Sequence, residues 1–182
     1  MVGCTYTGMP QTDAFVRNVI GCNMSFRARA FELGGDFKLG RAEGRIDQNH
    51  EDTYYCINLT KVIPGSKILY RPAARVNHYV PPSRGTWRYF FKRCWSEGSS
   101  KAKLSRIVGS DKSLSNEKSY VAKTLPLGVL RGLVDVLRPD LTGPARSVAI
   151  VLGLATTSIG YVRGLSTLTA SGSPPTGISP KQ

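Results

Sequence analysis

The chain has 182 residues, of which 41% are hydrophobic and 20% charged; 25 Lys and Arg residues against 12 Asp and Glu residues give a formal net charge of +13. The length suits one ordinary domain with appendages, and the content of apolar residues excludes wholesale disorder. So large a positive charge predicts a polyanionic neighbour: anionic lipid headgroups, nucleic acid or an acidic protein surface.

The N-terminal residues 1–24 are expected to form a helix or extension, because Thr12 is a suitable N-cap residue and Asp13 follows in the first turn. No secretory signal pattern is present at the N-terminus, so we expect a reducing or organellar setting. The cysteines lack Cys-x-x-Cys spacing, which argues against a zinc site and favours free thiols. They are Cys4, Cys22, Cys56 and Cys94.

Residues 25–80 alternate between apolar and polar side chains in short runs, and glycines or a Pro-Gly pair separate these runs. The clearest runs are 55–60 and 67–70. A period of two with this punctuation predicts three to five short antiparallel strands. We therefore expect a small antiparallel β domain over residues 25–95, which also includes the segment described next.

The segment 84–95 is the densest run of basic and aromatic residues in the chain. Three interpretations remain open: stacking on single-stranded nucleic acid, insertion at a membrane interface, or the central contact of a protein interface. The predicted polyanion or interface residues are Arg84, Trp87, Arg88, Tyr89, Phe91, Lys92, Arg93 and Trp95.

Residues 96–124 are rich in Ser and Lys and predict a polar, basic connector, and the Pro- and Gly-containing residues 169–182 predict an irregular tail. Between them, residues 125–168 predict a pair of helices. The first is amphipathic and ends at Pro139. The second contains an uncharged run, 147–162, between two arginines.

Sixteen residues of helix rise about 24 Å, which is short of a hydrocarbon core of about 30 Å. The uncharged run is nevertheless expected to form a single transmembrane span, and a soluble helical hairpin is the alternative. Small residues recur every fourth position, which favours close packing against another helix. The predicted helix-packing residues are Ala149, Gly153, Thr157, Thr156, Gly160 and Gly164. The fold class predicted for the whole chain is thus α+β.

Local signatures of catalysis are missing around the two histidines, His50 and His78. His50 is expected to lie in a polar loop with Glu51 and Asp52, where no known metal-ligand spacing occurs. The run 35–42 has the two glycines of a phosphate-binding loop but lacks its Lys and hydroxyl residue, which indicates turn glycines. We therefore expect no catalytic residues, no cofactor and no metal site.

These patterns predict a non-catalytic accessory or structural subunit of a larger membrane complex. A mitochondrial inner-membrane respiratory or ATP synthase assembly is the favoured setting, because no secretory signal is present. The expected partners are other subunits of that complex and anionic lipid headgroups, with nucleic acid as a further partner class. A soluble RNA-binding or ribonucleoprotein subunit and a small viral structural or movement protein are the alternatives.

Overall fold

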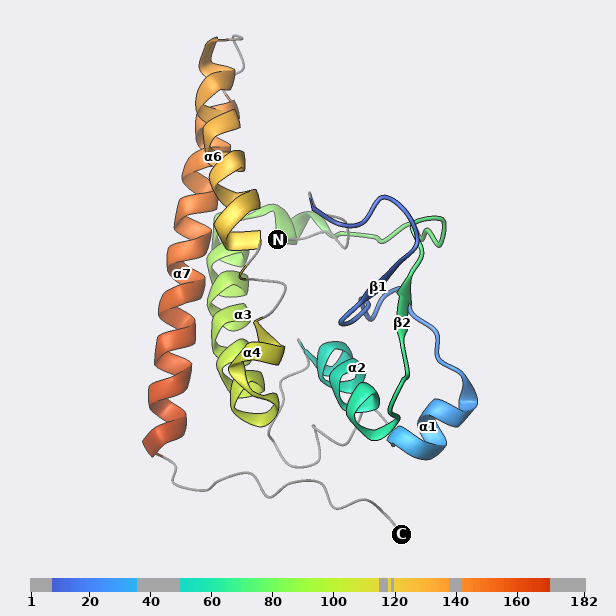
Figure 1. Ribbon diagram of the computed structural model, residues 1–182. Helices are drawn as coiled ribbons and strands as arrows, with labels where there is room; N and C mark the ends of the chain where they lie inside the picture. The colour runs from blue at the N-terminus through green and yellow to red at the C-terminus, as the bar shows by residue number, and fades with distance from the viewer. Residues whose placement is uncertain (1–7, 36–49, 115–117, 119, 138–141, 171–182) are drawn as a thin grey trace.

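The computed structural model describes residues 8–35, 50–114, 118, 120–137 and 142–170. Helices dominate the described residues, and one two-stranded antiparallel sheet accompanies them (Figure 1). Strand β1 (Ala14–Val16) pairs with β2 (Ile68–Tyr70) so that Phe15 lies opposite Leu69. The β domain expected from the alternating pattern is therefore reduced to two strands of three residues each.

Helices α1 (Ala28–Gly34) and α2 (Glu51–Val62) pack together beside this sheet. The ring of Tyr55 contacts the rings of Phe26 and Phe31, with centroids 5.0 and 5.6 Å apart. Gly34 allows a close approach, because a Cβ atom there would lie 2.7 Å from Leu59 Cδ1. Residues 8–35 and 50–70 are referred to below as the N-terminal unit.

The helix predicted within residues 1–24 is wrong for the described part of that range, because residues 14–16 form β1 and no helix occurs between residues 8 and 24. The alternative of an N-terminal extension remains a prediction. The strand predicted for residues 55–60 is also wrong, because these residues belong to α2. Every residue from Thr53 to Leu59 is buried, so the apolar alternation does not separate an inner from an outer face. A helix that is buried on all sides shows no amphipathic period in its sequence. In this segment small or polar residues alternate with large apolar ones, which resembles the period of a strand.

A single long helix, α3 (Trp87–Val108), contains the basic aromatic segment and continues through residues expected to form a loose connector. The short 3-10 helix η2 (Pro82–Gly85) precedes it, and Thr86 caps it by accepting a hydrogen bond from the Tyr89 backbone N–H at 3.2 Å. Small residues such as Gly98, Ser100 and Ala102 are buried along α3, and Gly98 and Ala102 lie at its contact with α7. The four-residue helix α4 (Ser110–Ser113) follows.

The C-terminal region begins with the π-helical turn η3 (Tyr120–Thr124) and continues as α6 (Leu125–Val134) and the 3-10 turn η4 (Asp135–Leu137). Helix α7 (Thr142–Ala170) is the longest element. Figure 1 shows α6 alongside its N-terminal part and α3 alongside its C-terminal part. The tail predicted for residues 169–182 lies outside the described residues from 171 onward, and so does most of the glycine run 35–42.

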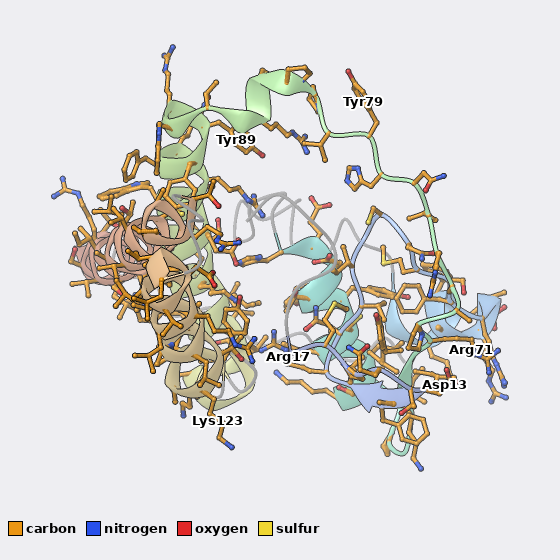
Figure 2. All side chains as sticks on the ribbon, turned by 90° about the horizontal axis from the view of Figure 1, so that it is seen from above. Asp13, Arg17, Arg71, Tyr79, Tyr89 and Lys123 are labelled. Atoms are coloured by element: carbon orange, nitrogen blue, oxygen red, sulfur yellow. The ribbon has the colours of Figure 1, made fainter. Side chains whose placement is uncertain are left out.

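A small apolar core joins the N-terminal unit to the long helices. Tyr54 and Ile57 of α2 pack against Leu104 and Val108 of α3, and all four side chains are buried. A polar contact reinforces this junction, since Arg17 donates a hydrogen bond to the Ser113 carbonyl at 2.6 Å. Arg17 projects from the N-terminal unit toward the helices in the view from above (Figure 2).

Candidate functional site

An open pocket lies between the N-terminal unit and the helices α3 and α7. Its walls come from the sheet and the loops beside it, from the start of α2, from one side of α3, and from η3 and α7. The segment that carries Tyr79 passes over from the sheet to α3, where Tyr89 lies (Figure 2). Segments distant in the sequence therefore contribute to one concave surface, which is the usual setting of a binding site.

Five polar residues from the start of α2 and from α3 line this surface and are called the polar cluster: His50, Asp52, Arg93, Glu97 and Lys101. Glu97 lies at its centre. Its carboxylate is 3.3 Å from Arg93 Nη2, 3.6 Å from Lys101 Nζ and 3.5 Å from His50 Nε2. Arg93 and Lys101 reach it because residues four apart lie on the same side of a helix. The carboxylate of Glu97 thus already interacts with three neighbouring basic groups.

Asp52 is held differently, through backbone donors at the start of α2. Its Oδ2 accepts a hydrogen bond from the Gly21 N–H at 2.9 Å, and its Oδ1 accepts one from the Thr53 N–H at 2.6 Å. A carboxylate at this position also interacts favourably with the positive end of the helix dipole. Asp52 therefore presents a fixed negative charge to the pocket, with no ion pair to it among the described residues.

A further part of the pocket lining is apolar. Helix α7 contributes Ala149, Ile150, Gly153 and Leu154 to this apolar lining, and α3 contributes Phe90. Gly153 brings the helices close, since a Cβ atom there would lie 2.9 Å from Phe90 Cζ. One pocket thus combines fixed charges with an aliphatic surface, an arrangement that suits an amphiphilic ligand with a charged head.

Only part of the predicted basic aromatic set faces this pocket. Arg84, Tyr89 and Arg93 line it. The other members do not, because successive residues of a helix point about 100° apart. Trp87, Phe91 and Trp95 follow one another at four-residue spacing and are 57%, 38% and 41% exposed. Arg88 and Lys92 are also exposed. The role predicted for this set remains a prediction.

The predicted helix-packing residues lie mostly between α3 and α7 of the same chain. A Cβ atom on Gly160 would lie 2.6 Å from the Trp95 carbonyl oxygen, and one on Gly164 would lie 2.8 Å from Ala102 Cβ. Ala149 and Thr157 line the pocket, and the Thr156 hydroxyl donates to the Leu152 carbonyl at 2.8 Å. Packing against a partner protein through these residues remains a prediction.

The sequence indicated a polar loop for His50 and Asp52 and gave no signal for Glu97, which meets His50 only in the fold. A usable signal was the pair of acids directly before the apolar run 53–59, because acidic residues are typical of the first turn of a helix. The described residues contain no group of three or more His, Cys, Asp or Glu side chains placed to hold a metal ion. Behind Asp52, burial raises the pKa of the Cys56 thiol, and the negative charge of Asp52 adds to this.

Comparison with known proteins gives one relative of this chain. It is 29% identical over 170 residues to the glucosyl-dolichyl phosphate glucuronosyltransferase of Haloferax volcanii, an alignment that covers 92% of this chain and 53% of that enzyme. The chain therefore spans about half the length of the curated relative it matches. No family model matches the chain, and no solved structure matches it.

This similarity to a named glycosyltransferase overturns two expectations, that of a non-catalytic accessory subunit and that of a protein without enzymatic function. The expected role in a mitochondrial complex is corrected for the same reason, and nothing points to the mitochondrial inner membrane.

The similarity and one apolar helix together indicate membrane association. Within α7, residues 142–167 are long and apolar enough to cross a membrane, and only 11% of their most apolar stretch is buried in the protein. A core helix of a soluble domain would be mostly buried. Here the apolar side chains of the helix are largely exposed.

Proposed function

We propose that this chain takes part in glycosyl transfer at a membrane, and that its pocket holds an acceptor carried on a lipid phosphate. Two observations support this proposal. The relative is a glucuronosyltransferase whose name specifies glucosyl-dolichyl phosphate. The pocket is lined both by the polar cluster and by aliphatic residues of α7, as an acceptor with a sugar phosphate head and a hydrocarbon chain requires. The second observation carries the proposal, because it comes from this chain's own residues.

Glycosyl transfer needs a base and a group that stabilises a leaving anion. The acceptor hydroxyl oxygen bonds to the anomeric carbon of the donor sugar as the bond from that carbon to the donor phosphate breaks. The hydroxyl proton passes to a base, and the phosphate leaves with the bonding electrons. Asp52 is the proposed base, because backbone N–H groups fix its carboxylate at the pocket surface. Glu97 is less suited, since three basic groups already surround it.

Basic residues at the pocket would bind the phosphate groups. Arg84 and Arg93 both line it, and a guanidinium group presents paired donors that match phosphate oxygens. Lys101 adds a further positive charge on the same side of α3. Ile150 and Leu154 of α7 would contact the first part of the hydrocarbon chain. In this arrangement the sugar of the acceptor lies between Arg93 and Asp52.

A transfer assay with the full chain tests the proposal. The chain is reconstituted into vesicles that contain glucosyl-dolichyl phosphate, and radiolabelled UDP-glucuronic acid or UDP-glucose is added outside. We expect label to enter the organic phase only when the acceptor lipid is present. Vesicles with unmodified dolichyl phosphate provide the control for acceptor choice. Failure to label the lipid with either donor contradicts the proposal.

A further inference from the structure

Helix α7 has two sides of opposite character. The side that meets α3 carries Gly153, Gly160 and Gly164. At 100° per residue, the other side carries a row of aliphatic residues that are between 40% and 65% exposed. This row is called the outer face of α7: Val148, Val151, Leu152, Ile159 and Val162. It has the length of about four helical turns and contains no charged residue.

Helix α6 extends this apolar surface. Leu127, Leu130, Leu133 and Val134 are all more than half exposed, while Gly128 and Gly132 face α7. Isolated exposed aliphatic residues are ordinary on a soluble protein, but two adjacent helices with continuous apolar faces mark a surface that is covered in the working protein.

Helix α3 decides how a membrane would cover this surface. It runs alongside α7 from Phe90, which meets Gly153, to Arg106, which donates a hydrogen bond to the Leu165 carbonyl at 3.1 Å. Over this length α3 carries six charged residues and packs on its far side against the N-terminal unit. They are Lys92, Arg93, Glu97, Lys101, Lys103 and Arg106. If α7 crossed the bilayer, this charged helix would lie at the depth of the hydrocarbon core, where ionised side chains are strongly disfavoured.

We propose that α7 lies in the plane of an anionic membrane, with its outer face and the exposed side of α6 in the lipid, and does not cross the bilayer. This arrangement keeps the charges of α3 and the N-terminal unit in water. It also removes the apolar residues of α7 from water, as in monotopic proteins whose amphipathic helices lie at the membrane interface. The inference does not depend on the chemistry proposed above for the pocket.

The charges of α3 favour anionic lipid as the occupant over an apolar protein partner. Arg88, Lys92 and Arg106 are exposed and lie on the side of α3 opposite Glu97 and Leu104, which face the N-terminal unit. Each basic residue near a negatively charged leaflet adds to the attraction. Helix α3 also exposes the rings of Trp87 and Trp95, and aromatic residues of this kind are typical of the headgroup region.

The first test measures vesicle binding by flotation with phosphatidylcholine vesicles that contain or lack phosphatidylglycerol. Val151→Asp places a charge on the outer face, and we expect vesicle binding to weaken about tenfold or more. The variant loses the burial of the valine side chain in lipid, and the carboxylate is disfavoured there. Val62→Asp is the matched control, since the two valines are 54% and 44% exposed and Val62 belongs to α2, which packs against α1 and α3. Equal binding of both variants overturns the proposal.

The second test locates the two ends of α7. Cysteines are introduced as Ala145→Cys and Ser166→Cys at exposed positions, and the protein is added to sealed anionic vesicles. A membrane-impermeant maleimide should label both positions from the outside, with peptide mapping to separate them from Cys22. Protection of one end shows that α7 crosses the bilayer and overturns the proposal. A second result would also overturn the proposal. If the wild type is a dimer in the absence of vesicles and Val151→Asp is a monomer, the outer face of α7 joins two copies of the chain and is not covered by lipid.

Discussion

The carbonyl oxygen of Thr157 in α7 lies where a Cβ atom on Gly98 of α3 would be. The Tyr161 backbone nitrogen lies 2.7 Å from the same position. The two backbones are therefore in direct contact, without side chains between them. Since α3 carries part of the polar cluster and α7 part of the apolar lining, this contact fixes the position of these two groups of residues relative to each other.

Gly98→Ala should consequently separate the two helices. Overpacking at a site without room costs about 1–3 kcal/mol, and here the obstacle is backbone that cannot rotate away, so we expect the upper end of that range. Chemical denaturation followed by circular dichroism measures the change. Gly85→Ala is the control, because a Cβ atom there would meet nothing within 4 Å. Equal stability of the two variants would show that α3 and α7 do not touch at Gly98.

The Cys56 thiol should make stability depend on pH in the alkaline range. Burial raises its pKa above the ordinary value of 9.0, so the folded state holds the proton more tightly than the unfolded state. The corresponding stabilisation is fully present below pH 9.0 and is lost as the pH rises through the folded-state pKa. The free energy of unfolding of the wild type should therefore fall more steeply with pH in this range than that of Cys56→Ala.

Thiol reactivity gives an independent check on this environment. Cys22 is exposed, whereas Cys56 and Cys94 are buried. Iodoacetamide at neutral pH should modify Cys22 rapidly and Cys56 only after denaturation, as followed by peptide mass spectrometry. Modification of Cys56 at the rate of Cys22 in the folded protein would refute the buried position.

Asp52→Asn removes the proposed base but keeps a carbonyl oxygen that can accept the hydrogen bond from Gly21. Loss of a general base typically lowers a rate about 10²–10⁴-fold, and we expect a drop of that size in sugar transfer to the lipid with unchanged vesicle binding. Asp13→Asn is the matched control. Asp13 pairs with Arg71 at 3.1 Å and is not itself among the residues that line the pocket, so this variant should transfer normally. Similar rates for both variants would exclude Asp52 as the base.

Part of this fold could be predicted from the sequence. The strand β2 lies within the alternating run 67–70, and helices occur where apolar residues recur at helical spacing over 125–137 and where the long uncharged run lies. These signals are local. They depend only on which residues are apolar and on Pro and Gly at the ends.

The failures involve burial that a single segment does not reveal. Helix α2 is enclosed by α1 and α3, so the polar residues Asn58 and Thr53 are buried with the apolar ones and the helical period disappears. Helix α3 was divided at residue 96 because its small residues resemble a linker, although Gly98 and Ala102 are small in order to admit α7. The polar cluster could not be predicted because His50 and Glu97 are 47 positions apart and meet only when α2 packs on α3.

Photoaffinity labelling tests most directly whether the pocket holds a lipid-linked sugar. The probe is a glucosyl-polyprenyl phosphate with a diazirine close to the phosphate, incorporated into anionic vesicles with the full chain. After irradiation, peptide mapping should find label on residues 84–101 and 149–157, and excess unlabelled glucosyl-dolichyl phosphate should compete it away. Label confined to the outer face of α7 and to α6, unaffected by competition, would show that the chain meets this lipid only as bulk membrane and would contradict the proposed site.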